Sequence, residues 1–541
     1  MICSLVIGLG CTQRPAEPPS SEPSSEPSSE PPSSEPSSEP PSSEPSARRG
    51  DTLVVGLGSD PGNANPLVIP YAVSFSISDL VTPGLVRRID GFEPALASSS
   101  SWSGDRMSLT YTLRRDLAWE DGVPLTSADV AFTWSLLSDP AVASNWYGDA
   151  EHVAALEAPD PYTVRFRYTR RRNPVLQQSV TVRGVLPRHQ LQGVDRATLR
   201  GHDSARAPLA SGPWRIASWE PDERIVLQPN PAAPGDWRPY LDRIVFRIIP
   251  EYAVRALELE RGGIDLLQDL EVADIARFKA DPRLRVIRSG AGVMQYVGYN
   301  LRKPPLDDLR LRRALTLATD RDQLIDRVLT AGDEVYGRPC VGTVSPRWPG
   351  WVPPELEPLP HDPVEARRLL AEVGFDGAAP LRLTMMLQTD SSELLQIAVW
   401  LQAQWREVGV ELSLERIEPT RFSERARSGD FELLLWSFGA NPVVDPSIQW
   451  RSGGPYNWMG FSDPEVDRLL DAGVHAATVE EAQTAFHEVQ RRVYAAQPAT
   501  FLFWRDTALA IDRRFHDTQH DTYSPLRHAE AWWVEADERR Y

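Results

Sequence analysis

Cysteine, histidine and carboxylate side chains are the groups of this chain that could carry out nucleophilic or acid–base chemistry. The sequence contains no His-Glu-x-x-His zinc helix, no glycine-rich phosphate loop ending in Lys-Ser or Lys-Thr, and no Gly-x-Ser-x-Gly turn. Cys340 follows Pro339 in a segment that is typical of a loop, and we expect a buried, unreactive thiol there. These patterns predict that the protein is not an enzyme.

Two histidines have a spacing that could bind a metal. His516 and His520 are four residues apart, and His528 lies downstream. On a helix, two imidazoles at this spacing share one face and can chelate a metal ion. Thr522 and Pro525 instead favour an extended chain, in which the two rings need not converge. We therefore predict no metal site and no cofactor.

The stretch 111–134, YTLRRDLAWEDGVPLTSADVAFTW, predicts a strand, a tight turn and a helix in succession. Apolar and polar residues alternate at its start, as in a half-buried strand. An Asp-Gly pair at 121–122 provides the turn, because glycine tolerates a positive φ. Thr126 or Ser127 is a suitable N-cap, and Asp129 lies in the first helical turn, where a negative charge is favourable.

This stretch resembles, nearly position for position, the signature of periplasmic solute-binding proteins of the peptide/nickel family, which deliver solutes to ABC importers. Further segments are similar to landmarks of that family in the expected order: 93–97 (EPALA), 210–214 (ASGPW), 297–332 and 361–374. The resemblance covers about residues 51 to 541.

The resemblance implies an α/β protein with a periplasmic-binding-protein-like two-lobe fold, mixed sheets and an extra inserted subdomain. A helix predicted over 394–408, between strands at 381–387 and 410–417, fits this class, because such a unit makes a right-handed crossover. The expected divisions are a lipoprotein signal remnant at 1–11, a disordered Ser/Glu/Pro tether at 12–49, lobe I at 50–91, 209–290 and 505–541, an inserted subdomain at 92–208, and lobe II at 291–504.

An amphipathic helix is predicted over 309–317, and three of its side chains are arginines. We interpret Arg310, Arg312 and Arg313 as surface and helix-pairing charges rather than ligand contacts.

The resemblance places the ligand site after the apolar strand predicted at 431–436. In peptide-binding relatives, an aspartate three residues after the tryptophan at the end of this strand accepts the peptide α-amine, and here that position is Gly439. The remaining candidates are aromatic and amide side chains, which suit a mid-sized organic ligand through stacking and a few hydrogen bonds. They are Trp436, Phe438, Asn441, Tyr456, Asn457 and Trp458 from one lobe, and Asn63, Asn65, Tyr71 and Phe75 from the other. The alternative for each aromatic residue is a place in the hydrophobic core.

The first residues, MICSLVIGLGC, look like the end of a bacterial lipoprotein signal peptide, with cleavage before Cys11 and acylation of that cysteine. Repeated SSEP units follow, which bury too little apolar surface to fold and, at about 3 Å per residue, reach up to roughly 100 Å. A frayed tail is the alternative, because no basic residue precedes the apolar run.

Composition limits the partners of the folded body. The formal net charge is −18, and the seven glutamates and three arginines of residues 12–49 account for −4, which leaves −14 on the rest. This acidity argues against nucleic acid and against broad binding to anionic lipid. Hydrophobic residues make up 41% of the chain, consistent with a sizeable core.

We expect a lipid-anchored, monomeric receptor of the bacterial cell envelope, in the periplasm or on the outer cell surface. Its lobes would close over an oligopeptide or similar mid-sized solute, and ABC transporter permease subunits would recognise the closed form. Two alternatives stay open: a sensory or envelope receptor of the same fold, and a receptor for a sugar, an opine or a metal chelate. A hydrolase would be revealed by turnover of the captured ligand.

Overall fold

The computed structural model describes residues 48–68, 72–89, 91–179, 183–376, 380–389, 391–439, 444–520 and 525–541. The predicted signal remnant with Cys11, nearly all of the tether, and the candidate ligand residues Tyr71 and Asn441 lie outside these ranges. For Phe75, another candidate ligand residue, the structure describes the backbone and not the side chain. In the described part of the chain, no helix combines the length and the apolar character needed to cross a bilayer.

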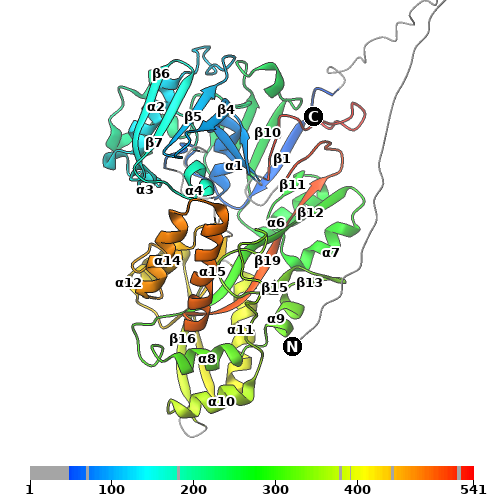
Figure 1. Cartoon of the computed structure of the whole chain (residues 1–541). Helices are drawn as coiled ribbons and strands as arrows, with labels where there is room; N and C mark the ends of the chain where they lie inside the picture. Colours follow the sequence, from blue (N-terminus) through cyan, green and yellow to red (C-terminus); the bar gives the residue numbers. More distant parts are fainter. Residues whose placement is uncertain are drawn as a thin grey trace, which may run out of the picture. The chain divides into compact units, whose positions relative to one another are not determined.

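The described strands include an eleven-stranded mixed sheet that contributes to both lobes (Figure 1). Its order is β17 (Val410–Ile417), β16 (Leu381–Gln388), β18 (Leu433–Gly439), β12 (Leu284–Tyr299), β19 (Ala499–Asp512), β11 (Leu266–Leu267), β1 (Thr52–Leu57), β10 (Arg243–Ile248), β9 (Arg224–Pro229) and β8 (Trp214–Glu220), with β15 (Gly337–Pro339) paired to β19. Strands β8 to β11 and β1 belong to the first lobe, and β16 to β18 belong to the second.

Two long antiparallel strands, β12 and β19, connect the lobes. Their pairing runs from Leu284 opposite Asp512 to Gly298 opposite Ala499, and its register is interrupted between Ser289 and Val293. On one side of this interruption β19 pairs with β11, and on the other side β12 pairs with β18. One pair of strands therefore passes through both lobes.

Helices cover the sheet in both lobes. In the first lobe these are α1 (Ala72–Val81), α6 (Tyr252–Arg261) and α7 (Val272–Ala280). In the second they are α8 (Leu309–Leu317), α9 (Arg321–Val328), α10 (Pro363–Glu372), α11 (Ser392–Glu407), α12 (Pro419–Ser428), α13 (Ser447–Trp450), α14 (Pro464–Val474) and α15 (Val479–Ala496). Side chains of Asp, Ser or Thr accept backbone N–H groups at the starts of α8, α9, α10, α11, α14 and α15, which explains where these helices begin.

The inserted subdomain has an antiparallel sheet of its own. Its strands are β4 (Ala97–Trp102), β5 (Ser108–Leu113), β7 (Thr163–Tyr168) and β6 (Val153–Asp160), in that order, and its helices are α2 (Ser127–Leu137), α3 (Tyr147–Ala150), α4 (Pro174–Ser179) and α5 (Arg188–Leu191). The predicted strand, turn and helix of 111–134 are confirmed. Gly122 has φ +87°, Thr126 is the N-cap, and the Asp129 carboxylate accepts the Thr126 N–H at 2.9 Å. Two short hairpins, β2 (Val86–Ile89) with β3 (Gly91–Pro94) and β13 (Thr330–Ala331) with β14 (Glu334–Val335), lie outside these sheets.

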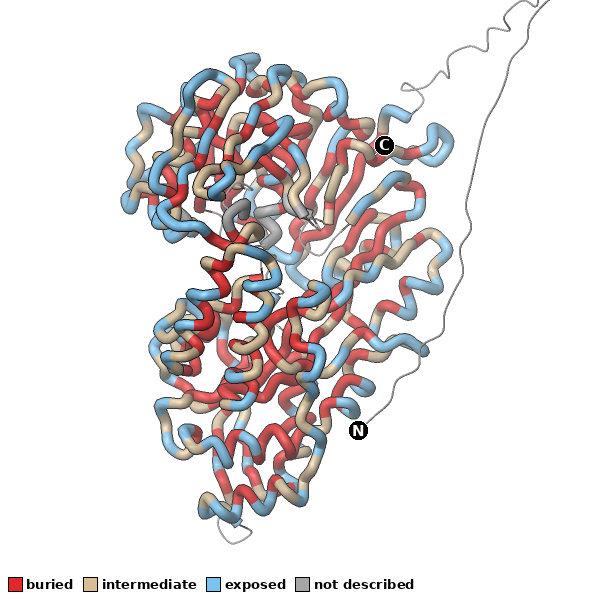
Figure 2. Tube along the Cα trace, in the orientation of Figure 1, coloured by how far each residue is buried: buried red, intermediate tan, exposed pale blue. Residues whose placement is uncertain are grey.

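Buried residues follow the central strands and the inner faces of the helices (Figure 2). The largest hydrophobic cluster extends from Val54 and Leu267 in the first lobe to Leu401 and Leu435 in the second. After β19 the chain packs beside β1, since Trp532 lies in the same hydrophobic cluster as Leu53 and Val55.

The surface interpretation of the three arginines is wrong for Arg312. Its side chain is buried and donates to four backbone carbonyls, including those of Ala496 and Gln497 at the end of α15. Carbonyls at a helix C-terminus lack partners within the helix, so a guanidinium is a suitable donor. Arg312 therefore pairs α8 with α15, in agreement with the predicted helix-pairing role. Arg310 is exposed and forms an ion pair with Asp308.

Candidate functional site

Aromatic side chains gather where β18 leaves the core. The first residues of β18 are fully buried, and its side chains become partly exposed from Trp436 onward. Trp436 stacks on Phe422 with ring centroids 5.2 Å apart and contacts Trp458 at 5.1 Å. Tyr456 contacts Trp458 at 5.7 Å and Phe438 at 5.8 Å. We call these five residues the aromatic cluster.

The exposure of the rings in the aromatic cluster increases from the core to the surface. Phe422 is fully buried and Trp458 nearly so, whereas Tyr456 is 41% exposed. Edge-to-face and stacked contacts of this kind fix each ring in place. The exposed end can therefore present preorganised ring surface to a ligand.

Buried polar contacts hold the end of β18 in position. Gln295 on β12 is buried; its amide donates to the Trp436 carbonyl at 2.9 Å and its oxygen accepts the Ser437 hydroxyl at 2.7 Å. Because β18 also pairs with β12 from Leu433 to Gly439, the backbone beneath the aromatic cluster is bonded along its whole length.

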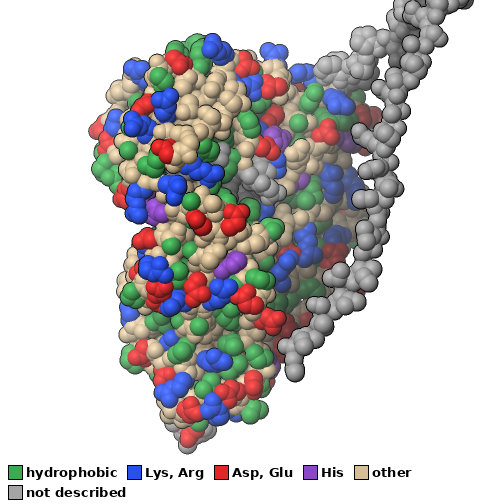
Figure 3. Space-filling model, viewed as in Figure 1, with side chains coloured by type: hydrophobic (Ala, Val, Ile, Leu, Met, Phe, Trp, Pro, Cys, Tyr) green, Lys and Arg blue, Asp and Glu red, His purple; other side chains and the backbone are tan. Residues whose placement is uncertain are grey.

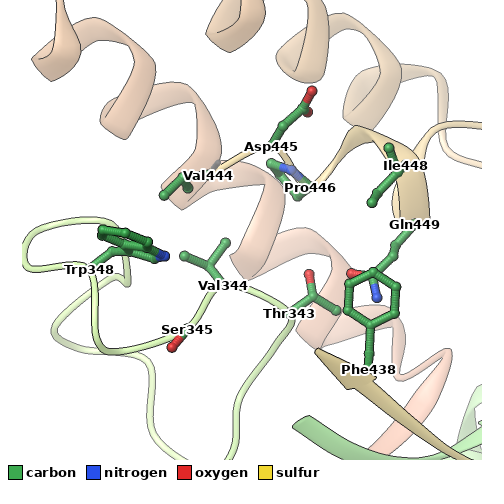
Figure 4. A pocket seen from close by; sticks show the side chains of 10 residues that line it. All are labelled: Thr343, Val344, Ser345, Trp348, Phe438, Val444, Asp445, Pro446, Ile448 and Gln449. Carbon is green, nitrogen blue, oxygen red and sulfur yellow. The ribbon is translucent and has the colours of Figure 1, made fainter. Parts of the chain in front are cut away.

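A small cavity lies beside Phe438 (Figure 4). It is lined by Thr343, Val344, Ser345, Trp348, Phe438, Val444, Asp445, Pro446, Ile448 and Gln449. Its volume is about 10 Å³, which is space for a single water molecule. The lining is mainly apolar. Figure 4 shows the Asp445 carboxylate pointing away from the cavity centre, and this carboxylate accepts the Ser447 N–H at 2.9 Å.

The predicted amide residues that the structure describes are bound within the chain. Asn457 donates to the carbonyls of Arg451 and Phe461 and accepts the Phe461 N–H, so its amide is fully used by its own loop. Asn63 and Asn65 form successive turns, each accepting the N–H two residues ahead. These contacts do not support a direct role in binding for Asn457 or Asn63.

The structure thus brings together four predicted residues: Trp436, Phe438, Tyr456 and Trp458. It adds residues that sequence reasoning missed, namely Phe422 from α12 and the wall formed by Thr343, Val344 and Trp348. The segment 340–351 has no periodic pattern, and its Pro and Trp content was the only available signal.

The groups considered for catalysis or metal binding have other surroundings. Burial raises the pKa of the Cys340 thiol to about 12, and the sulfur donates to the Gly342 carbonyl. A neutral buried thiol is a poor nucleophile. His516 stacks on Trp533, and the ring of His520 contacts Trp532, so each imidazole packs on a separate indole. Among the residues that the structure describes, no three His, Cys, Asp or Glu side chains converge as a metal site would require.

On the face shown in Figure 3, charge is spread rather than concentrated. Acidic and basic side chains are intermingled on the face shown in Figure 3. Many of them form surface ion pairs, such as Arg468 with Glu465 at 2.7 Å. Such exposed pairs contribute little to stability.

Comparisons with known proteins agree with the fold. The family profile described as "Bacterial extracellular solute-binding proteins, family 5 Middle" matches residues 91–460. The oligopeptide-binding protein AppA of Bacillus subtilis (strain 168) is 23% identical over 507 residues, which cover 90% of this chain and 92% of AppA. The structure of AppA in complex with a nonapeptide is similar with a TM-score of 0.80 and 21% identity, over 90% of this chain and 99% of that chain.

Two further relatives differ in the ligands that their names give. The probable D,D-dipeptide-binding periplasmic protein DdpA of Escherichia coli (strain K12) is 26% identical over 488 residues, 86% of this chain and 90% of DdpA. MoaA from A. tumefaciens R10, solved in complex with mannopinic acid, has a TM-score of 0.76 and 23% identity, over 90% of this chain and 100% of that chain.

Proposed function

Because the chain belongs to the bacterial extracellular solute-binding proteins of family 5, we propose that it captures a short peptide or peptide-like solute with aromatic or apolar side chains and delivers it to an ABC importer. The relatives are binding proteins rather than enzymes, in agreement with the predicted lack of catalytic motifs. Binding is non-covalent and is completed when the lobes close.

The single observation that carries the proposed ligand class is the aromatic cluster at the end of β18. Exposed ring surface of Phe438 and Tyr456, backed by buried rings, is suited to stacking against planar or apolar groups. The adjacent cavity has space for one water molecule only, so the proposed ligand class rests on the exposed rings and not on this cavity.

The described part of the site offers no carboxylate placed to hold an amine. Position 439 is glycine, and Asp445 is turned away and bound to Ser447. We therefore expect recognition to depend on side-chain stacking and backbone hydrogen bonds, with peptides whose N-terminus is acetylated binding about as well as free ones.

Native mass spectrometry of the full chain purified from its own cells tests the ligand class, because a retained solute is identified by its mass. Thermal shifts with defined probes follow: a tripeptide of aromatic residues, a tripeptide of glutamates, mannopinic acid and a nickel–histidine complex. The proposal expects the largest shift with the aromatic peptide. A shift confined to mannopinic acid or to the nickel complex would assign the site to a non-peptide solute.

Tyr456→Ala tests the site itself. Removing one stacking ring should weaken binding of the aromatic tripeptide about tenfold, while stability changes little because the ring lies at the exposed end of the aromatic cluster. Tyr147→Ala is a matched control, since Tyr147 is equally exposed at 41% and lies on α3. Equal affinities for the two variants, measured by calorimetry, would remove Tyr456 from the site.

We also propose that the mature protein is a monomer anchored through acylated Cys11, with the Ser/Glu/Pro segment as a spacer and the permease subunits of an importer as partners. The support is the apolar run ending in Gly10-Cys11 followed by repeated SSEP units. Labelled palmitate should enter the wild-type chain and not a Cys11→Ser variant. Equal labelling of both would exclude this anchor.

A further inference from the structure

Two separate segments of the inserted subdomain meet the second lobe at one corner, residues 474–478, where α14 ends and α15 begins. The backbone N–H of Asn173, just before α4, donates to the Val474 carbonyl at 2.8 Å. The guanidinium of Arg106, at the tip of the hairpin between β4 and β5, donates to the Ala477 carbonyl at 3.4 Å. Figure 1 shows α4 beside the ends of α14 and α15.

Apolar packing joins the same surfaces. Leu176 on α4 is buried, yet it is absent from the hydrophobic clusters of the inserted subdomain. It belongs instead to the cluster of the second lobe that contains Val474 and Met294. Leu176 of the inserted subdomain thus packs in the core of the second lobe. Burial of this side chain favours contact between the subdomain and the second lobe.

The chemistry of the corner matches its partners. Val474 is the last residue of α14, so its carbonyl is among those without a partner inside the helix, and this end of the helix carries partial negative charge. The backbone N–H of Asn173 is a donor that such an end prefers. Arg106 donates instead to the carbonyl of Ala477, in the loop just before Thr478, the N-cap of α15. Both segments are also preorganised: Asn173 accepts the Val175 N–H, and Asp105 accepts the Ser103 hydroxyl and the Met107 N–H.

The inserted subdomain is attached to the first lobe. Its main cluster includes Leu85, Val86 and Trp237 from outside the insertion, and the Glu120 N–H donates to the Ala210 carbonyl at 2.9 Å. A movement that separates the lobes about β12 and β19 would therefore carry the subdomain away from the 474–478 corner. The hydrogen bonds of Asn173 and Arg106 at the corner involve no residue of the aromatic cluster, whereas Leu176 packs in the hydrophobic cluster that also contains Phe422 and Trp458.

We propose that Arg106, Asn173 and Leu176 form a latch that holds the inserted subdomain on the 474–478 corner and thereby sets the equilibrium between open and closed lobes. The latch rests on the proposed function only in that the closed form is the one that retains solute. Because it is built from protein groups alone, it favours closure before any solute binds and adds to the affinity for every solute alike.

Amide hydrogen exchange of the full chain without added solute tests the latch directly. Leu176→Ala should accelerate exchange of the Asn173 amide and of residues 474–478 about tenfold, and the radius of gyration from small-angle scattering should increase. Arg106→Ala should have the same effect to a smaller extent. Arg171→Ala, an exposed change beside the same segment, should leave both measurements as in the wild type.

Amide exchange in β5 and β7 shows whether Leu176 acts in the latch or stabilises the core of its own subdomain, because these strands form the centre of the subdomain's sheet. Unchanged protection there, with faster exchange at Asn173 and the corner, supports the latch. Loss of protection in β5 and β7 would show that Leu176 stabilises its own subdomain and would overturn the proposal. Unchanged exchange and scattering in an Arg106→Ala, Leu176→Ala double variant would overturn it as well. None of these outcomes depends on the identity of the solute.

Discussion

Gly439 ends β18 beside the aromatic cluster, and a Cβ added at this position meets no heavy atom of the described residues within 4 Å. The Cβ of an aspartate there would therefore not clash with the described residues. We predict that Gly439→Asp creates selectivity for free N-terminal amines, since a charge-assisted hydrogen bond contributes roughly 1.5–3 kcal/mol. In calorimetry, a free aromatic tripeptide should bind at least about tenfold more tightly than its N-acetylated form.

Gly439→Asn is the control for this change, because it has the size of aspartate without the charge. It should bind the free and the acetylated peptide alike, as the wild type does. Equal affinity of Gly439→Asp for both peptides would show that the ligand amine does not lie near residue 439.

Glu530 is a buried carboxylate between Arg87 and His528. Burial by itself raises the pKa of this group, but the hydrogen bond from His528 and the charge of Arg87, 2.8 Å away, outweigh burial and lower the pKa to about 2. Glu93 faces the same histidine and forms an ion pair with Arg527. A carboxylate with a lowered pKa stabilises the folded state above its ordinary pKa of 4.5, and this contribution is lost as the pH falls from 4.5 toward 2.

Glu530→Gln should therefore lower the free energy of unfolding by up to about 3 kcal/mol at pH 7 and by much less near pH 2. Urea unfolding of both proteins across this range measures the difference. A difference that stays constant from pH 7 to pH 2 would show that the carboxylate charge is not what stabilises the fold.

The sequence predicted residues that lie together in the structure, namely the aromatic ones, and also amides whose hydrogen bonds are made within their own loops. Trp436 and Phe438 follow an apolar strand, so their position at its exposed end could be inferred from local pattern. Asn457 could not be assigned from pattern, because a short amide next to its own backbone is as easily used for turns as for ligands. Val344 and Trp348 come from a loop, where only the folded chain determines which side chains face the cavity.

Among the elements, β12 and β19 carry the mechanical connection between the lobes, and the buried carboxylate of Asp506 binds the backbone at their register interruption. Ala291, in the interruption, has φ +50°, and its N–H donates to Asp506 at 2.6 Å. Asp506 is 1% exposed and also accepts from Arg288 at 2.6 Å. The irregular backbone is thus fixed by a buried carboxylate with two strong donors.

Asp506→Asn should lower the free energy of unfolding by about 2–4 kcal/mol, because Arg288 loses its buried anion and an amide cannot accept from both donors equally well. Urea denaturation measures the loss. Glu334→Gln is the comparison. Glu334 is exposed, so the loss of its ion pair with Lys279 should leave the unfolding midpoint unchanged. Equal midpoints for the two variants would show that the interruption does not depend on Asp506.

The elements themselves were largely predictable where local periodicity is strong. The helix expected over 309–317 is α8 to the residue, and the strand, helix and strand expected between 381 and 417 are β16, α11 and β17. The continuous sheet was not predictable, because β12 pairs with β19 more than two hundred residues later and no local pattern records that pairing. Arg312 was misjudged for the same reason, since its partners at the end of α15 are distant in sequence.

For the whole molecule, the lobes are joined in two ways that differ in strength. One hydrophobic cluster contains buried residues of β11 and α7 from the first lobe together with residues of α8, α11 and β18 from the second. The Asn173, Leu176 and Arg106 contacts lie instead between the inserted subdomain and the 474–478 corner. The shared cluster buries many more side chains, so we expect it to persist when the lobes separate and to couple their unfolding.

Leu267→Ala tests this coupling. Leu267 lies on β11 of the first lobe and is fully buried in the shared cluster, so truncation should cost about 2–4 kcal/mol. If the cluster unites the lobes, amides around Trp405 in the second lobe should lose protection together with those around Trp214 in the first, and circular dichroism and fluorescence should report one transition. If only the first lobe loses protection in Leu267→Ala, the two lobes unfold as separate units, and the shared cluster does not couple them.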